Sequence, residues 1–234
     1  MAQINFDDVQ NNSNNQNGVN FFGLADDGDE AVVRILCDDV ADFDILSVHE
    51  EMVNGKRRKI DCLRTPRDPL DMCPLCSAGH RTSQRFFIHL LEYIKDEDGV
   101  IQVYPRIWER STAYCTTLKN LIEEYGPLSN SVFKIRRNGA KGDLKTTYSI
   151  MFGNPSIYKE EFYPIDVSGF EGYSVLGTIV LSKDEHDLQY FLNCGEFPET
   201  SSDSNAEKST VDTSSRPIRT VPNVPVQRPG QRRY

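Results

Sequence analysis

The sequence predicts a β-rich α+β domain, and three observations carry this prediction. Short runs of β-branched and aromatic residues, bounded by turn residues, recur between residues 30 and 152. Helical patterns are few, and they do not alternate with strands as they do in a βαβ protein. The central part of the 234 residues is apolar enough for one core, whereas both ends are not. We therefore expect a small barrel or a related arrangement rather than a Rossmann-type sheet.

Six or seven strands are expected. Residues 30–36 read EAVVRIL after an acidic turn and predict the first strand. Asn54-Gly55 predicts a hairpin between strands at 43–53 and 56–63, because Asn-Gly favours a two-residue turn. In that register His49 lies opposite Ile60, and Cys62 lies on the same face of the hairpin as His49. The same patterns predict further strands at 85–94, 100–108, 131–137 and 145–152.

Two or three short helices are also expected, and two of them can be placed. Residues 112–125 have apolar side chains at helical spacing, with Ser111 or Thr112 as the cap and Gly126-Pro127 as the stop. Ser182 and Glu185 resemble a capping box and predict a last helix that runs to about Leu192.

Both ends of the chain differ from this core in composition. Residues 1–20 are rich in Asn, Gln and Asp, so we expect a flexible arm. Residues 196–234 are rich in Ser, Thr, Pro and Arg, and we expect a disordered tail. The expected core is therefore 21–195. No stretch is apolar enough to span a membrane and residues 1–20 do not resemble a signal peptide, so the six cysteines are expected in a reducing cytosol.

The strongest chemical signal is His49-x12-Cys62-x10-Cys73-x2-Cys76. Thiolates and neutral imidazole are the ligands that tetrahedral Zn²⁺ prefers, and a Cys-x2-Cys turn presents two sulfurs to one ion. Four protein ligands leave no open position, so we expect a structural zinc in a subdomain of about residues 45–80. His80 is an alternative fourth ligand.

The other three cysteines lack such partners. Cys37, Cys115 and Cys194 are therefore expected in the core.

The charge distribution matters more than the net charge of −9. Residues 1–53 hold twelve acidic side chains and one Arg, whereas residues 54–85 hold eight Lys or Arg and three Asp. Residues 134–145 hold five Lys or Arg and one Asp. A fold that brings these two basic islands together makes a positive groove in an acidic protein, although each island alone can also be an ordinary solvated face.

Aromatic residues alternate with basic ones in and between these islands. Bases stack on exposed rings while Lys and Arg pair with phosphates, so this combination is typical of single-strand binding. Phe86, Phe87 and Phe133 are expected in the core instead. The candidate nucleic-acid contacts are Lys56, Arg57, Arg58, Lys59, Tyr93, Tyr104, Arg106, Trp108, Arg110, Tyr114, Arg136, Arg137, Lys141 and Tyr148.

The Cys/His spacing, the run Asp68-Pro-Leu-Asp-Met-Cys-Pro-Leu-Cys76 and the acidic turn before Val32 resemble the single-stranded DNA-binding proteins of T4-like bacteriophages. The resemblance covers about residues 20–155. It implies a five-stranded OB-type barrel with an inserted zinc subdomain. It also implies a non-enzymatic protein that coats single-stranded DNA in phage replication, recombination and repair, in the cytoplasm of the bacterial host.

Two features depart from that family. The family has a basic N-terminal arm that drives cooperative binding, but no Lys or Arg precedes Arg34 here. The family has an acidic C-terminal tail that recruits replication proteins, whereas residues 196–234 hold five acidic and six basic side chains. We therefore expect the tail to contact different replication or recombination proteins, or to make a weak extra DNA contact.

Two other functions were weighed. His49-Glu50-Glu51 followed by the Cys73 and Cys76 pair imitates the motif of zinc-dependent nucleobase deaminases. Met72 stands where that motif has Pro, and Cys62 closes the position that a catalytic water needs. The other alternative is a zinc-stapled adaptor that binds protein.

Overall fold

The structure is a computed structural model that describes residues 21–159 and 161–198. Its contacts divide Met1–Pro198 from Glu199–Tyr234. The expected arm at 1–20 and nearly all of the expected tail lie outside the described residues. Of that tail, Phe197 is described: its ring stacks on Phe191, with the centroids 5.0 Å apart.

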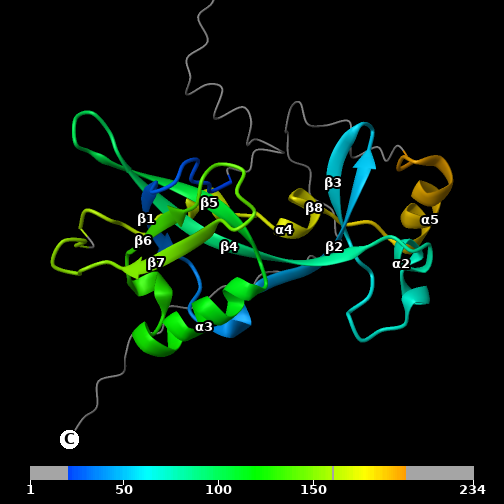
Figure 1. Ribbon diagram of the computed structural model, residues 1–234, viewed down its shortest axis with the longest axis horizontal. Coiled ribbons are helices and arrows are strands. Elements are labelled where there is room, and N and C mark those ends of the chain that lie inside the picture. Colours follow the sequence, from blue (N-terminus) through cyan, green and yellow to red (C-terminus); the bar gives the residue numbers. More distant parts are fainter. Residues whose placement is uncertain (1–20, 160, 199–234) are drawn as a thin grey trace, which may run out of the picture. The chain divides into compact units, whose positions relative to one another are not determined.

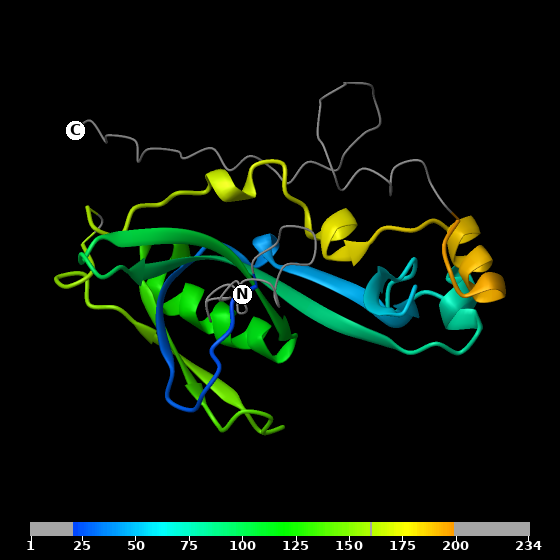
Figure 2. The same cartoon turned by 90° about the horizontal axis from the view of Figure 1, so that it is seen from above.

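The described residues form one mixed sheet with a few short helices, as Figures 1 and 2 show. The strands are β1 (Glu30–Ile35), β2 (Asp44–Val53), β3 (Lys56–Asp61), β4 (Thr82–Lys95), β5 (Ile101–Ser111), β6 (Phe133–Asn138), β7 (Thr147–Phe152) and β8 (Val180–Leu181). The α-helices are α2 (Pro74–Ser77), α3 (Ala113–Tyr125), α4 (Val175–Thr178) and α5 (Glu185–Cys194). The 3₁₀ turns are η1 (Val40–Asp42), η2 (Leu70–Met72), η3 (Leu128–Asn130) and η4 (Ser168–Phe170).

The strand order is β7-β6-β1-β4-β2-β3-β8, and β5 pairs with β4. The long strand β4 joins the whole arrangement, because β5 pairs along one edge while β2 and then β1 pair along the other. Only the β3–β8 pair is parallel. Within the described residues no ladder joins β5 to β7, so the sheet is not closed. The β-rich α+β prediction is confirmed, whereas the ladders do not form the closed barrel that the resemblance implies.

The β2–β3 hairpin has the predicted register. Val53 pairs with Lys56 and His49 pairs with Ile60. Asn54 and Gly55 have φ angles of 51° and 73°, as the two-residue turn requires. Because side chains two residues apart share one face of a strand, this register holds His49 and Cys62 on the same side of the hairpin.

Apolar residues gather in three clusters. The largest lies between α3 and the sheet and includes Phe86, Trp108 and Phe133. A second surrounds Cys62, Cys73 and Cys76 and includes Leu188 and Phe191 from α5. The third packs residues 170–180 on Phe87 and Ile107. The predicted burial of Phe86, Phe87 and Phe133 is confirmed.

Several local predictions need correction. Thr112 precedes α3 but makes no capping hydrogen bond through its side chain. The cap of α5 is Asp184, whose carboxylate accepts from the Asp187 N–H, rather than Ser182. Cys37 is buried and Cys115 is half-buried, but Cys194 is exposed and the prediction that it lies in the core is wrong. None of the described helices has the length and apolar character needed to cross a bilayer.

Candidate metal centre and nucleic-acid interface

His49, Cys62, Cys73 and Cys76, here called the Cys/His cluster, converge from three elements. One ligand atom from each lies within 4.8 Å of the others, and all four side chains are buried. His49 Nε2 is 3.5 Å from Cys73 Sγ and 3.7 Å from Cys76 Sγ. The sulfurs of Cys62 and Cys76 are 3.6 Å apart. The structure thus brings together the four residues that the sequence predicted.

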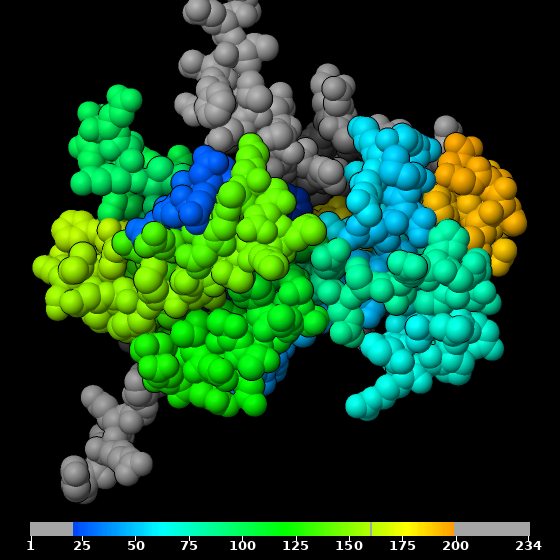
Figure 3. All heavy atoms as spheres, viewed as in Figure 1, coloured from blue at the N-terminus to red at the C-terminus, as the bar shows by residue number. Residues whose placement is uncertain are grey.

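Local structure accounts for this convergence. The hairpin carries His49 on β2, and Cys62 directly follows β3. Cys73 precedes α2, whose first residue is Pro74, so Cys76 lies one turn further along. α2 and α5 both lie to the right of the β2–β3 hairpin in Figures 1 and 3. Leu188 and Phe191 of α5 complete the apolar cover over the cysteines.

The imidazole of His49 is oriented for metal binding. Its Nδ1 lies 3.1 Å from the Arg81 carbonyl, and the N–H donor in that hydrogen bond leaves the Nε2 lone pair directed at the sulfurs. Burial lowers the pKa of His49, although the bond to Arg81 opposes the shift. The ring is therefore neutral near pH 7, which is the form that binds a metal.

The three thiols differ in their surroundings. Burial raises the pKa of Cys62 to about 12. Burial also opposes ionisation of Cys73, but backbone N–H groups of Cys76, Leu63 and Leu75 outweigh it and lower the pKa of Cys73. Arg64 donates through Nε to Cys76 Sγ at 3.1 Å. A thiolate cluster thus has both backbone donors and one guanidinium to stabilise its negative charge.

Arg64 was not predicted from the sequence. Its Nη1 also donates to the carbonyls of Thr65 and Asp68, so it ties the loop after β3 to the cluster. Its position two residues after Cys62 could have indicated this role. A Cys₃His site with Zn²⁺ carries one net negative charge, which a neighbouring arginine stabilises.

His80 does not belong to the cluster. Its Nδ1 lies 2.7 Å from Glu51 Oε1, so the alternative fourth ligand pairs with a carboxylate instead. Glu51 is thereby engaged as well. The donor set of three sulfurs and one neutral imidazole fits a tetrahedral Zn²⁺ with no open position. Such a site can staple the hairpin to α2, and it has no vacant place for a reacting water.

Four candidate nucleic-acid contacts form a second site, here called the Arg110 cluster. The Arg110 guanidinium carbon lies 4.1 Å from the ring centre of Tyr148, 4.7 Å from that of Trp108 and 6.0 Å from that of Tyr114. The rings of Tyr114 and Tyr148 are half-buried, whereas Trp108 is fully buried. Arg110 Nε and Trp108 Nε1 are buried without a hydrogen-bond partner. The cluster joins β5, β7 and the start of α3.

Other candidates have different environments. Tyr93 is 6 % exposed and donates to the Pro164 carbonyl, so neither Tyr93 nor Trp108 presents a ring face to solvent. Arg137 donates to the carbonyls of Leu24, Gly139 and Ala140 and to Tyr148, which makes it a brace beside the Arg110 cluster.

Several of the candidate cations are paired with carboxylates. Arg57 pairs with Glu50, Lys59 with Glu109, Arg106 with Glu92, and Arg136 with Glu30. Lys56 and Lys141 are exposed, Arg58 is half-buried, and Tyr104 is 39 % exposed beside Arg106. Pairing reduces the positive field that the sequence predicted for these segments.

The two basic islands are not merged into one patch. Lys59 of the first island reaches Glu109 of β5, whereas Tyr148 beside the second island contacts Arg110. Because neighbouring residues of a strand point to opposite faces, Lys59 and Tyr148 contact β5 from opposite faces. The Arg110 cluster, rather than a groove between the islands, is therefore the candidate interface.

Comparison with known proteins adds no family. No model of a protein family matches this chain, and no curated protein matches it either.

Proposed function

We propose that this protein binds and coats single-stranded DNA through the Arg110 cluster, with the Cys/His cluster holding a structural zinc. The observation that carries the proposal is the close grouping of a guanidinium with two tyrosine rings that are only partly buried. Rings of this kind stack on bases without regard to sequence, and the guanidinium pairs with phosphate. The resemblance to the phage proteins supports the same function, in replication, recombination and repair in the bacterial cytoplasm.

The buried donors of the Arg110 cluster support this proposal. Leaving an N–H group without an acceptor costs about 1–3 kcal/mol, and both Arg110 Nε and Trp108 Nε1 are in this state. Because Trp108 is fully buried, Arg110 is the member of this pair that can meet a phosphate of a bound strand, since its side chain is only half-buried. We also propose that β5 and β7 are the two margins of an OB-type barrel. Trp108 and Tyr148 bridge them, with ring centres 5.4 Å apart.

We propose that the zinc acts as a staple and that the protein is not an enzyme. A deaminase needs a metal-bound water and a free carboxylate beside it. Here Cys62 completes the ligand set, and Glu51 is held by His80. The zinc instead fixes the arm that carries Lys56, Arg57 and Arg58.

A stacking variant tests the proposed function. Tyr148→Ala should weaken binding of a fluorescein-labelled oligo-dT by roughly 5- to 150-fold in fluorescence anisotropy at low salt, because one base stack contributes about 1–3 kcal/mol. Tyr190→Ala is the matched control, since Tyr190 is 37 % exposed on α5, outside the Arg110 cluster. Equal affinities for the wild type and Tyr148→Ala would remove this cluster from the interface.

A further inference from the structure

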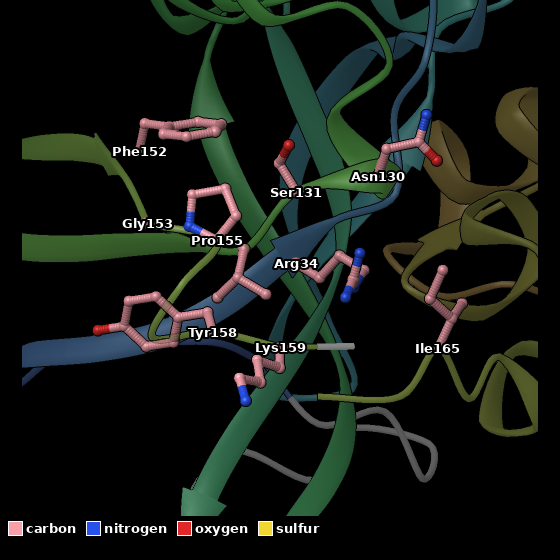
Figure 4. A pocket seen from close by; sticks show the side chains of 10 residues that line it. Arg34, Asn130, Ser131, Phe152, Gly153, Pro155, Tyr158, Lys159 and Ile165 are labelled. Atoms are coloured by element: carbon pink, nitrogen blue, oxygen red, sulfur yellow. The ribbon is translucent and has the colours of Figure 1, made fainter. Parts of the chain in front are cut away.

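A pocket lies at the beginning of β6, away from both sites described above. Its volume is about 410 Å³, within the usual range for small-molecule sites. None of the fourteen candidate nucleic-acid contacts lines it. Figure 4 shows the guanidinium of Arg34 on one side and the rings of Phe152, Pro155 and Tyr158 on the other. Asn130, Ser131 and Lys159 contribute polar groups.

Arg34 is the unusual residue of this pocket. It is 3 % exposed, yet it forms no ion pair with any carboxylate in the described part of the chain. Its guanidinium donates to the Ser129 carbonyl at 2.6 Å, the Tyr163 carbonyl at 2.9 Å and the Tyr93 hydroxyl at 3.1 Å. These are neutral acceptors, so the buried positive charge lacks a counter-charge. An anion bound in this pocket would provide that counter-charge.

The charge of the lining points the same way. The protein has 35 acidic residues and a net charge of −9, but no Asp or Glu is among the described residues that line the pocket. Lys159 adds a second cation whose side chain is 59 % exposed and is 3.8 Å from Glu161. Lys159 is thus paired, and the preference for an anionic ligand comes mainly from Arg34, which has no carboxylate partner among the described residues.

The aromatic wall is built by a close backbone approach. A Cβ at Gly153 would lie 2.6 Å from the Val132 carbonyl oxygen and 2.8 Å from Tyr158 Cδ2, so only glycine lets the Tyr158 ring pack there. Tyr158 makes an edge contact with Tyr163, whose carbonyl accepts from Arg34. The ring and the guanidinium are therefore positioned by one continuous set of contacts.

We propose that this pocket binds a nucleotide, with its phosphate toward Arg34 and Lys159 and its base against Tyr158. The nucleotide has two possible sources: a free mononucleotide, or one unit of a bound strand. Binding of a nucleotide that is part of a DNA strand rests on the proposed function, whereas binding of a free mononucleotide does not. Asn130 and Ser131 supply hydrogen-bonding groups for the sugar or base edge.

Calorimetric titration of the zinc-loaded full-length protein with deoxyadenosine monophosphate tests the pocket. We expect saturable binding, at least about tenfold tighter than binding of inorganic phosphate or of deoxyadenosine alone, because each carries half of the recognised groups. Lys159→Glu and Tyr158→Ala should each weaken binding about tenfold or more. Lys119→Glu is the matched control, since Lys119 is 57 % exposed and also 3.6 Å from a glutamate.

Three results would overturn the proposal: no saturable binding up to about 10 mM, equal affinity for phosphate alone, or affinities unchanged in both pocket variants. Repeating the titration with the protein saturated by oligo-dT separates the two sources. Loss of mononucleotide binding then indicates a strand-borne nucleotide, and retained binding indicates a free one. Because Tyr148 does not line the pocket, Tyr148→Ala tests the proposed function without removing the pocket.

Discussion

Replacing Arg110 with Met separates a role in binding from a role in folding. The change removes the positive charge and the buried Nε donor, but it keeps a long apolar stem against the rings of Trp108 and Tyr148. The opposing contributions to stability can be compared directly. Losing the cation–π contacts costs about 2 kcal/mol, whereas removing an unsatisfied buried donor returns about 1–3 kcal/mol. The free energy of unfolding should therefore change by less than about 1 kcal/mol.

Binding should respond much more strongly to the same change. A charge-assisted hydrogen bond to phosphate contributes about 1.5–3 kcal/mol, so affinity for oligo-dT should fall roughly 10- to 150-fold at low salt. The slope of log K against log salt should also become shallower by about 0.7, the value for one phosphate contact on a single strand. Fluorescence anisotropy over a salt series measures both quantities, and urea unfolding measures stability.

Arg106→Met is the matched control on the same strand. Arg106 donates to Glu92 at 2.8 Å, so its charge is already neutralised within the protein. We expect this control to lower stability, because Glu92 loses its partner, and to leave affinity within about threefold. An Arg110→Met protein with unchanged affinity and salt slope would refute the reasoning. So would a loss of stability of several kcal/mol, which would make Arg110 a core residue.

The remaining predictions concern the Cys/His cluster and its hairpin. Cys76→Ser should abolish stoichiometric zinc in elemental analysis. It should also lower the melting temperature by roughly 5–11 °C, since zinc at 100 times its Kd stabilises the protein by about 2.7 kcal/mol. Full zinc content would reject the ligand assignment, and Cys115→Ser is the control. Arg64→Met should keep zinc but weaken its affinity about 10- to 100-fold in chelator competition, and an unchanged affinity would show that the contact with Cys76 is incidental. Gly55→Ala should destabilise the hairpin by about 1–2 kcal/mol in urea because φ is +73° there, whereas Gly23→Ala, with open space around it, should have no effect; equal stabilities would exclude turn strain.

The metal cluster could be predicted from the sequence because its determinants are local. Asn54-Gly55 fixes the hairpin register, and that register fixes which face His49 and Cys62 share. The Cys73 and Cys76 pair is set by one short turn. Arg64 was missed because its role depends on a side chain folding back over the loop to Cys76.

The nucleic-acid interface was harder to predict because burial is a long-range property. Trp108 alternates with Glu109 along β5, and the sequence does not say which of the two faces meets α3 and the core. Tyr93 is buried for a similar reason, since residues 163 and 164 cover it. The two-residue strand β8 pairs with β3 across more than a hundred positions, which no local pattern indicates. The ion pairs of the candidate cations were missed for the same reason. Lys59 pairs with Glu109, far along the chain, and Arg106 pairs with Glu92 on the neighbouring strand.

Single-strand binding is tested most directly by comparing the affinities of the zinc-loaded wild-type protein for two labelled DNAs. An unstructured oligo-dT and a duplex of equal length are titrated in parallel from about 20 mM to 300 mM salt, the range over which phosphate contacts lose their strength. We expect saturable binding with preference for the single strand and a linear fall of log K with log salt. Absence of binding at the lowest salt, or equal affinity for the duplex, would contradict it.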